Sequence, residues 1–207
     1  MKIRHIVAAA VMTASPVLAW PASGTQQLRD FVAQVQSASG RFTQQAGDKQ
    51  GAGKPAQTGE FSFQRPGKFK WDVRKPYEQL IISDGKRLYQ YDPDLAQVTE
   101  RSVDQSIGAS PAAILFGSGA LEDVFELQDL PPRDGLEWLR AKPRSADAGF
   151  THVEIGFKGS MPQRIDLLDS FGQTTRISLT DIRANPKLDA AAFKFTPPPG
   201  VDVVKMQ

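Results

Sequence analysis

Two hydrophobic periods divide the chain. Residues 23–40 repeat apolar side chains at the i, i+3, i+4, i+7 spacing of one helix face. The apolar positions are Leu28, Phe31, Val32 and Val35. Ser23 and Gln26 have the spacing of a capping box, and Gly40 suits a helix end. The pattern therefore predicts an amphipathic helix that covers a sheet.

After this helix the period changes to two, which is typical of strands. Three strand pairs are separated by turn signals: Pro66-Gly67 suits a type II turn, Asp84-Gly85 a hairpin, and Pro93-Asp94 a further turn. Alternation predicts strands in 41–45, 60–64 and 68–73, three more within 78–103, and others at 136–143, 151–159, 163–170, 174–185 and 192–198.

These elements predict an α+β fold built on one large, mostly antiparallel sheet of about ten strands. A sheet that wide curls, and a concave face can be filled or capped by helices. No βαβ alternation, repeat or linker divides the chain, so we expect a single domain.

Residues 110–117 interrupt the strand pattern. Ser110 suits an N-cap, Pro111 the first helical position and Gly117 a stop. The short helix between them is apolar almost all round and contains Ile114, Leu115 and Phe116. Composition favours a buried connector, and the alternative is a small apolar lid.

The first 19 residues resemble a secretory signal. Lys2 and Arg4 precede an apolar stretch, and residues 17–19 suit a cleavage site after Ala19. The domain would then span residues 20–207 in a periplasm. The chain has no cysteine, so an N-terminal cysteine cannot anchor it to lipid.

Charge argues against nucleic acid as a partner. Removal of the signal takes away two of the 25 basic residues. The remaining 23 basic residues balance the 23 acidic ones, so the formal net charge falls from +2 to zero. Phosphate binding needs a surplus of Lys and Arg.

Catalytic signals are few. His152 is the one histidine beyond the signal, which leaves zinc sites and cysteine–histidine catalysis without ligands or nucleophile. No serine lies in a G-x-S-x-G turn, and no phosphate-binding glycine motif is present. We expect no enzymatic activity, no metal and no other cofactor.

One arginine falls among aromatic residues. Arg65 has the same strand parity as Phe61, Phe63, Phe69 and Trp71, which form either a core or the wall of an apolar pocket. The surrounding cations predict a solvated strand face or a docking rim, and they are Lys68, Lys70, Arg74 and Lys75.

Four segments in order resemble the periplasmic lipoprotein carriers of the LolA family. They are RPGKFKW (65–71), SDGKRLYQYDPDLAQVT (83–99), SPAAIL (110–115) and FKFTPPPGVDV (193–203), with RFTQ (41–44) after the first helix. The resemblance spans nearly the whole chain after the signal.

The resemblance implies an incomplete β-barrel closed by a helical lid, with a cavity for the acyl chains of lipoproteins. An inner-membrane ABC-type transporter would supply the cargo, and an outer-membrane receptor would accept it. We expect a monomer. Cavity and lid residues would be Val32, Phe61, Phe63, Phe69, Trp71, Ile114, Leu115 and Phe116.

Arg65 has a specific role in this resemblance. It would hold the empty lid shut through hydrogen bonds to backbone near Leu115 and Phe116 and near Val32. The alternatives are a non-catalytic glycolipid-binding or envelope-stress sensor protein of the same fold, and a hydrolase that uses His152.

Overall fold

A single twelve-stranded sheet organises the chain in the computed structural model, which describes residues 22–47, 55–103, 115, 121–145 and 148–206. The strand order is β12-β6-β5-β4-β3-β2-β1-β11-β10-β9-β8-β7. Every neighbouring pair is antiparallel except β12 and β6, which are parallel. Among the described strands, β12 and β7 remain the two edges, so the curled sheet is not closed into a barrel.

The elements have the following bounds. The helices are α1 (Gly24–Gln34), α4 (Leu121–Val124) and the 3-10 helix η2 (Ala190–Phe193). The strands are β1 (Ser37–Gly47), β2 (Gln57–Gln64), β3 (Lys68–Lys75), β4 (Gln79–Asp84), β5 (Arg87–Asp92), β6 (Gln97–Ser102), β7 (Phe125–Arg133), β8 (Leu136–Pro143), β9 (Phe150–Lys158), β10 (Met161–Asp169), β11 (Thr174–Ala184) and β12 (Asp202–Lys205).

Helix α1 begins as its capping pattern predicts. The Ser23 side chain accepts a hydrogen bond from the Gln26 backbone N–H at 3.3 Å. Its predicted end at Gly40 is wrong. The helix stops at Gln34 because Val35 is extended, and Gly40 lies inside β1, where a Cβ would meet the Phe61 ring at 2.7 Å.

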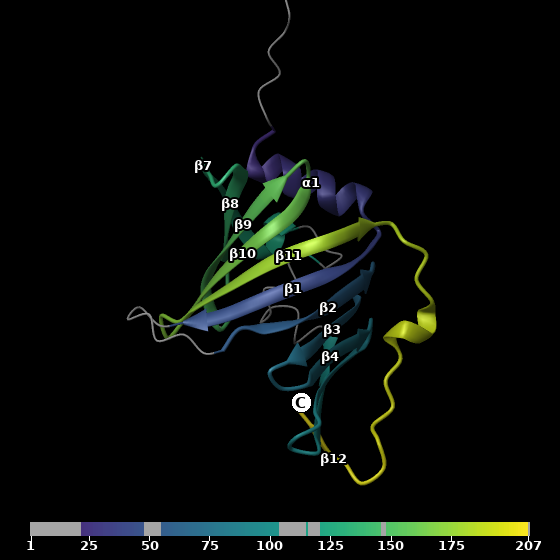
Figure 1. The fold of residues 1–207 in the computed structure, drawn as a ribbon. Helices are drawn as coiled ribbons and strands as arrows, with labels where there is room; N and C mark the ends of the chain where they lie inside the picture. The colour runs from purple at the N-terminus through teal and green to yellow at the C-terminus, as the bar shows by residue number, and fades with distance from the viewer. Residues whose placement is uncertain (1–21, 48–54, 104–114, 116–120, 146–147, 207) are drawn as a thin grey trace, which may run out of the picture.

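The inner face of the sheet carries the main core. Helix α1 lies across one end of this face (Figure 1) and packs against β7 to β10. Its Phe31 meets the rings of Phe63 and Phe157 edge to face, at centroid distances of 6.0 and 6.3 Å. Burial of the apolar helix face against the sheet explains the helical period of the sequence.

The outer face has a second apolar cluster beneath the C-terminal segment, residues 185–206, which runs from the end of β11 past β3 and β4 to β12 (Figure 1). Ile82 lies on this face because it pairs with Lys70, and Val98 lies there because it pairs with Tyr91. Helix η2 packs against β3 and β4, and Phe193 is buried.

One predicted strand is wrong, and two strands of the structure were not predicted. The expected strand at 192–198 is η2 followed by extended chain, because Asp189 caps the turn and Pro197–Pro199 offer no N–H to a ladder. Strands β7 and β12 were not predicted. Two prolines are tolerated in β7 because it is an edge strand with a register shift beside them.

We expect Phe193→Ala to lower the free energy of unfolding by about 3–5 kcal/mol, because it removes the buried aromatic ring through which the C-terminal segment packs on the sheet. Urea denaturation measures this change. Phe171→Ala is the matched control, since that ring is 92% exposed and its loss should change stability by less than about 0.5 kcal/mol. Equal effects of the two substitutions would contradict this account of the outer cluster.

Candidate functional site

Arg65 links three distant parts of the chain. It follows β2 in the turn to β3, and its Nε donates to the Val35 carbonyl at 3.0 Å. Its Nη2 donates to the Leu115 carbonyl at 2.6 Å. Its backbone N–H donates to the Gln36 carbonyl at 2.8 Å. The guanidinium therefore joins the end of α1 to residue 115.

The same guanidinium lies against aromatic rings. Its Cζ is 5.6 Å from the centroid of Phe31 and 5.1 Å from that of Phe63. Burial lowers the pKa of Arg65 to about 10, so the side chain remains protonated at neutral pH. Arg65 therefore lies beside the apolar face, where its charge meets backbone carbonyls and aromatic rings.

The partners of Arg65 lie in the segments where they were expected. The Leu115 carbonyl accepts from Arg65, and the partner expected near Val32 in the first helix is the carbonyl of Val35, three residues further on. Val35 caps α1, and carbonyls at a helix end lack a partner within the helix. Val32 packs against the core as a partly buried side chain.

Aromatic residues beside Arg65 converge on the inner face. Trp71 stacks on Phe42 with ring centroids 3.7 Å apart and lies 6.0 Å from the Phe61 centroid. Phe63 is buried in the same cluster, and Phe69 is partly buried against it. We call the rings of Phe42, Phe61, Phe63, Phe69 and Trp71 the aromatic wall.

Two glycines let the aromatic wall lie close to the sheet. A Cβ at Gly40 would come within 2.7 Å of the Phe61 ring. A Cβ at Gly59 would collide with the Asp72 carbonyl oxygen and lie 2.7 Å from the Phe42 ring. Glycine is therefore required for this packing, and not for a left-handed backbone.

Comparison with known proteins identifies the family. The model of the family described as "Outer membrane lipoprotein carrier protein LolA" matches residues 33–196. The chain belongs to the LolA family. An outer-membrane lipoprotein carrier protein of Bordetella avium is 63% identical over 204 residues, covering 99% of this chain and 98% of that protein. A protein of the same name from Bordetella pertussis is 59% identical over 201 residues, covering 97% and 94%.

Solved structures support the fold of this LolA-family chain. An uncharacterized conserved protein from Thermus thermophilus superposes with a TM-score of 0.55 at 15% identity, covering 88% of this chain and 99% of that one. A LolA superfamily protein from Nitrosomonas europaea gives 0.50 at 12% identity, covering 84% and 98%.

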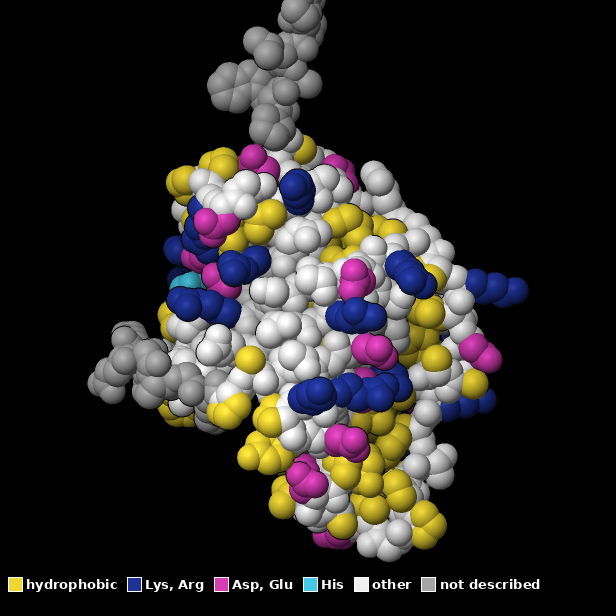
Figure 2. Space-filling view, in the orientation of Figure 1, with side chains coloured by type: hydrophobic (Ala, Val, Ile, Leu, Met, Phe, Trp, Pro, Cys, Tyr) yellow, Lys and Arg dark blue, Asp and Glu magenta, His cyan; other side chains and the backbone are white. Residues whose placement is uncertain are grey.

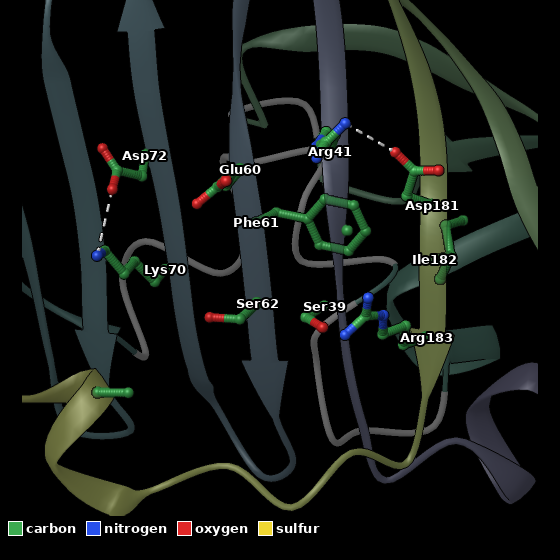
Figure 3. A pocket seen from close by; sticks show the side chains of 12 residues that line it. Ser39, Arg41, Glu60, Phe61, Ser62, Lys70, Asp72, Asp181, Ile182 and Arg183 are labelled. Atoms are coloured by element: carbon green, nitrogen blue, oxygen red, sulfur yellow. Dashed lines mark ion pairs between the residues drawn. The ribbon is translucent and has the colours of Figure 1, made fainter.

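The outer face has different chemistry. A groove of about 780 Å³ lies between β1, β2, β3 and β11 and is bordered by Ala192 of η2. Figure 3 shows its two ion pairs, Arg41 with Asp181 and Lys70 with Asp72, each at 3.2 Å. Charged side chains of both signs are interspersed over this view of the surface (Figure 2). Phe61 and Ile182 also reach this groove, but most of the side chains that line it are polar or charged, so it suits an acyl chain poorly.

The β3 cations alternate with the aromatic wall and so lie mainly on this outer face. Asp72 pairs with Lys70 at 3.2 Å and with Arg74 at 3.0 Å. Lys68 begins the strand, and Lys75 ends it as an exposed side chain. Part of the predicted basic cluster is therefore neutralised by an acid within it.

Several predictions lie outside the described residues. They are the signal at 1–19, the helix signals Ser110, Pro111 and Gly117, and the apolar side chains Ile114 and Phe116. Within the described ranges, no helix is long and apolar enough to cross a membrane.

His152 lies on the outer face among charged groups. Its Nε2 is 3.8 Å from Oε1 of Glu154. The Glu154 carboxylate accepts hydrogen bonds from Arg133 at Oε2 and from Arg140 at Oε1. Burial and the charge of Arg140 lower the pKa of His152. The described residues contain no group of three or more His, Asp or Glu side chains that could hold a metal ion.

Sequence reasoning left Phe42 out of the apolar site. Its alternation within 41–45 predicted a strand, yet its stacking on Trp71 depends on the pairing of β1 with β2 and of β2 with β3. That pairing brings the two rings to the same face, with Gly59 between them in the sheet.

We expect Gly59→Ala to lower the free energy of unfolding by about 1–3 kcal/mol, because the new methyl group meets backbone that cannot rotate away. The midpoint of urea unfolding measures the loss. Ser62→Ala on the opposite face of β2 is the control and should change stability by no more than about 0.5 kcal/mol. If Gly59→Ala were as stable as the wild type, β3 and the Phe42 ring could move to make room for the methyl group, which would contradict this account of the packing.

Proposed function

We propose that this LolA-family chain is a periplasmic lipoprotein carrier. It accepts acylated lipoproteins from an inner-membrane ABC-type transporter, shields their acyl chains against the aromatic wall, and delivers them to an outer-membrane receptor. The Bordetella relatives, each named as an outer-membrane lipoprotein carrier protein, support this function at about full length. The chain does this work by binding alone, without catalysis or a cofactor.

The observation that carries the proposal is the bridge made by Arg65. We call Arg65 together with the carbonyls of Val35 and Leu115 the Arg65 latch. An acyl chain that enters beside the aromatic wall must separate the segments that the latch joins. The latch therefore favours the empty, closed state over the loaded one.

Energetics explain why a carrier needs such a latch. Burial of an acyl chain contributes about 0.8 kcal/mol per CH₂, so one long chain supplies on the order of 10 kcal/mol. A protein that retained all of this free energy could not release its cargo. Hydrogen bonds from a charged donor, each worth roughly 1.5–3 kcal/mol, are weak enough to break and strong enough to lower net affinity. A ligand shifts a two-state equilibrium only by its differential affinity.

The cellular arrangement is part of the proposal. A signal at residues 1–19, cleaved after Ala19, would send a single domain of residues 20–207 to the periplasm. There it would act as a monomer. A glycolipid-binding or sensor role on the same fold is less favoured, because the Bordetella relatives that cover nearly the whole chain bear the carrier name.

The test of this function uses the chain without its signal, mixed with membranes that bear the transporter and a labelled lipoprotein. We expect a soluble one-to-one complex of carrier and lipoprotein, and transfer of the label to membranes that bear the receptor. Arg65→Leu should form the complex normally and fail to deliver, because the closed state no longer competes with cargo.

Arg65→Lys is the matched control for charge. One ammonium cannot reproduce the two separate nitrogens that reach Val35 and Leu115, so delivery should be restored only in part. Absence of the soluble complex with wild-type carrier would contradict the carrier function itself. Wild-type delivery by Arg65→Leu would contradict the latch alone.

We also propose that the cations of β3 form a docking rim for the membrane partners, with Lys68 and Lys75 as its main contributors because Asp72 already pairs with Lys70 and Arg74. Reversal of both charges, Lys68→Glu with Lys75→Glu, should slow transporter-dependent release about 3- to 10-fold at low salt and less at high salt. Lys187→Glu, an exposed charge on the C-terminal segment, is the control. Equal release rates for the wild type, the double variant and Lys187→Glu would contradict the docking rim.

A further inference from the structure

The Val35 side of the latch is held by a residue that sequence reasoning did not single out. Asn185 follows β11 and begins the C-terminal segment, 149 positions along the chain from Gln36. Its Oδ1 accepts from the Gln36 backbone N–H at 2.8 Å, and its Nδ2 donates to the Gln34 carbonyl at 3.0 Å. These bonds flank Val35 on both sides.

Further bonds from Asn185 extend this contact into β1. Its Oδ1 also lies 3.4 Å from the Ser37 backbone N–H, and its own N–H donates to the Ser37 carbonyl at 2.7 Å. The Ser37 hydroxyl in turn donates to the Pro186 carbonyl at 2.9 Å. The chain from residue 34 to residue 37 is thus fixed to the start of the C-terminal segment.

The backbone at Asn185 explains why this side chain reaches all of these groups. Its φ is +53°, in the left-handed region that asparagine tolerates better than most residues. This turns the amide toward the end of α1, where helix-end backbone groups need partners outside the helix. One amide side chain supplies both an acceptor and a donor there.

We propose that Asn185 is a positioning residue of the latch: it fixes the Val35 carbonyl where the Arg65 guanidinium meets it, and so sets how strongly the closed state opposes cargo. This rests on the proposed carrier function. Val35 receives the Arg65 bond between the two backbone positions that the Asn185 amide holds. Without the amide, that carbonyl would sample other orientations and the Arg65 bond would be made less often.

Asn185→Gly is the decisive variant. Glycine keeps the positive φ and the backbone bond to Ser37, so only the side-chain bonds are lost. Asp134→Gly is the matched control, because Asp134 has a φ of +54° in the turn between β7 and β8. Asn185→Asp is the second variant: it keeps the acceptor for Gln36 and loses the donor to Gln34.

The measurement is the equilibrium partition of a fluorescent triacylated peptide between preloaded carrier and phosphatidylglycerol vesicles. We expect Asn185→Gly to load normally and to retain the peptide about three- to tenfold more strongly than wild type, the size of one or two lost hydrogen bonds. Asn185→Asp should fall between the two, and Asp134→Gly should match wild type.

Combination with Arg65→Leu separates positioning from mere structural support. In the Arg65→Leu background, Asn185→Gly should add little to retention, because the bond that it positions is already absent. Wild-type partition by both Asn185 variants would overturn the proposal, and so would an equal shift in both backgrounds. If Arg65→Leu alone does not change partition while Asn185→Gly does, the latch of the proposed function fails and the positioning role falls with it. Thermal unfolding of each variant reports the structural effect separately.

Discussion

A partly buried cation imposes the central constraint on this structure. The Arg65 guanidinium lies against the rings of both Phe31 and Phe63, where its N–H groups lose part of their water and must find protein acceptors. Carbonyls at the end of α1 and at residue 115 meet this need. The requirement joins segments that are 30 and 50 positions away from Arg65 along the chain. Any rearrangement that admits an apolar ligand beside these rings must first exchange those acceptors.

The open sheet makes such a constraint useful because its two faces differ. The inner face carries the aromatic wall and the main core, and α1 covers one end of it. The outer face pairs its charges and buries a smaller apolar cluster beneath η2 and the C-terminal segment. Strands stabilised on the outer side can keep their pairing while packing on the inner side changes. The division also explains why the polar outer groove is unsuited to acyl chains.

Local patterns predicted much of this architecture, and tertiary pairing decided the rest. Alternation identified β2 and β3, and the capping spacing at Ser23 located the start of α1. The helix end predicted at Gly40 was wrong, because the sequence does not distinguish a glycine that makes room for an aromatic ring from one that ends a helix. Strand β7 was missed because its prolines are acceptable only at an edge, which no local window reveals. Alternation showed a cation among aromatic residues at Arg65, but its acceptors are backbone carbonyls, and the sequence does not show which carbonyls come close to it.

Asn185 was not predicted as a site residue for the same reason, because its side chain bonds to backbone groups. These bonds also show how the α1 side of the latch is supported. The Val35 acceptor belongs to a firmly held segment. Asn185 bonds to the backbone on both sides of Val35, and the Arg65 backbone adds a bond to Gln36 there. Moving the end of α1 would therefore break several bonds besides the one that the guanidinium makes to Val35. In the proposed carrier, the end of α1 is thus the fixed support on which the Arg65 guanidinium is held.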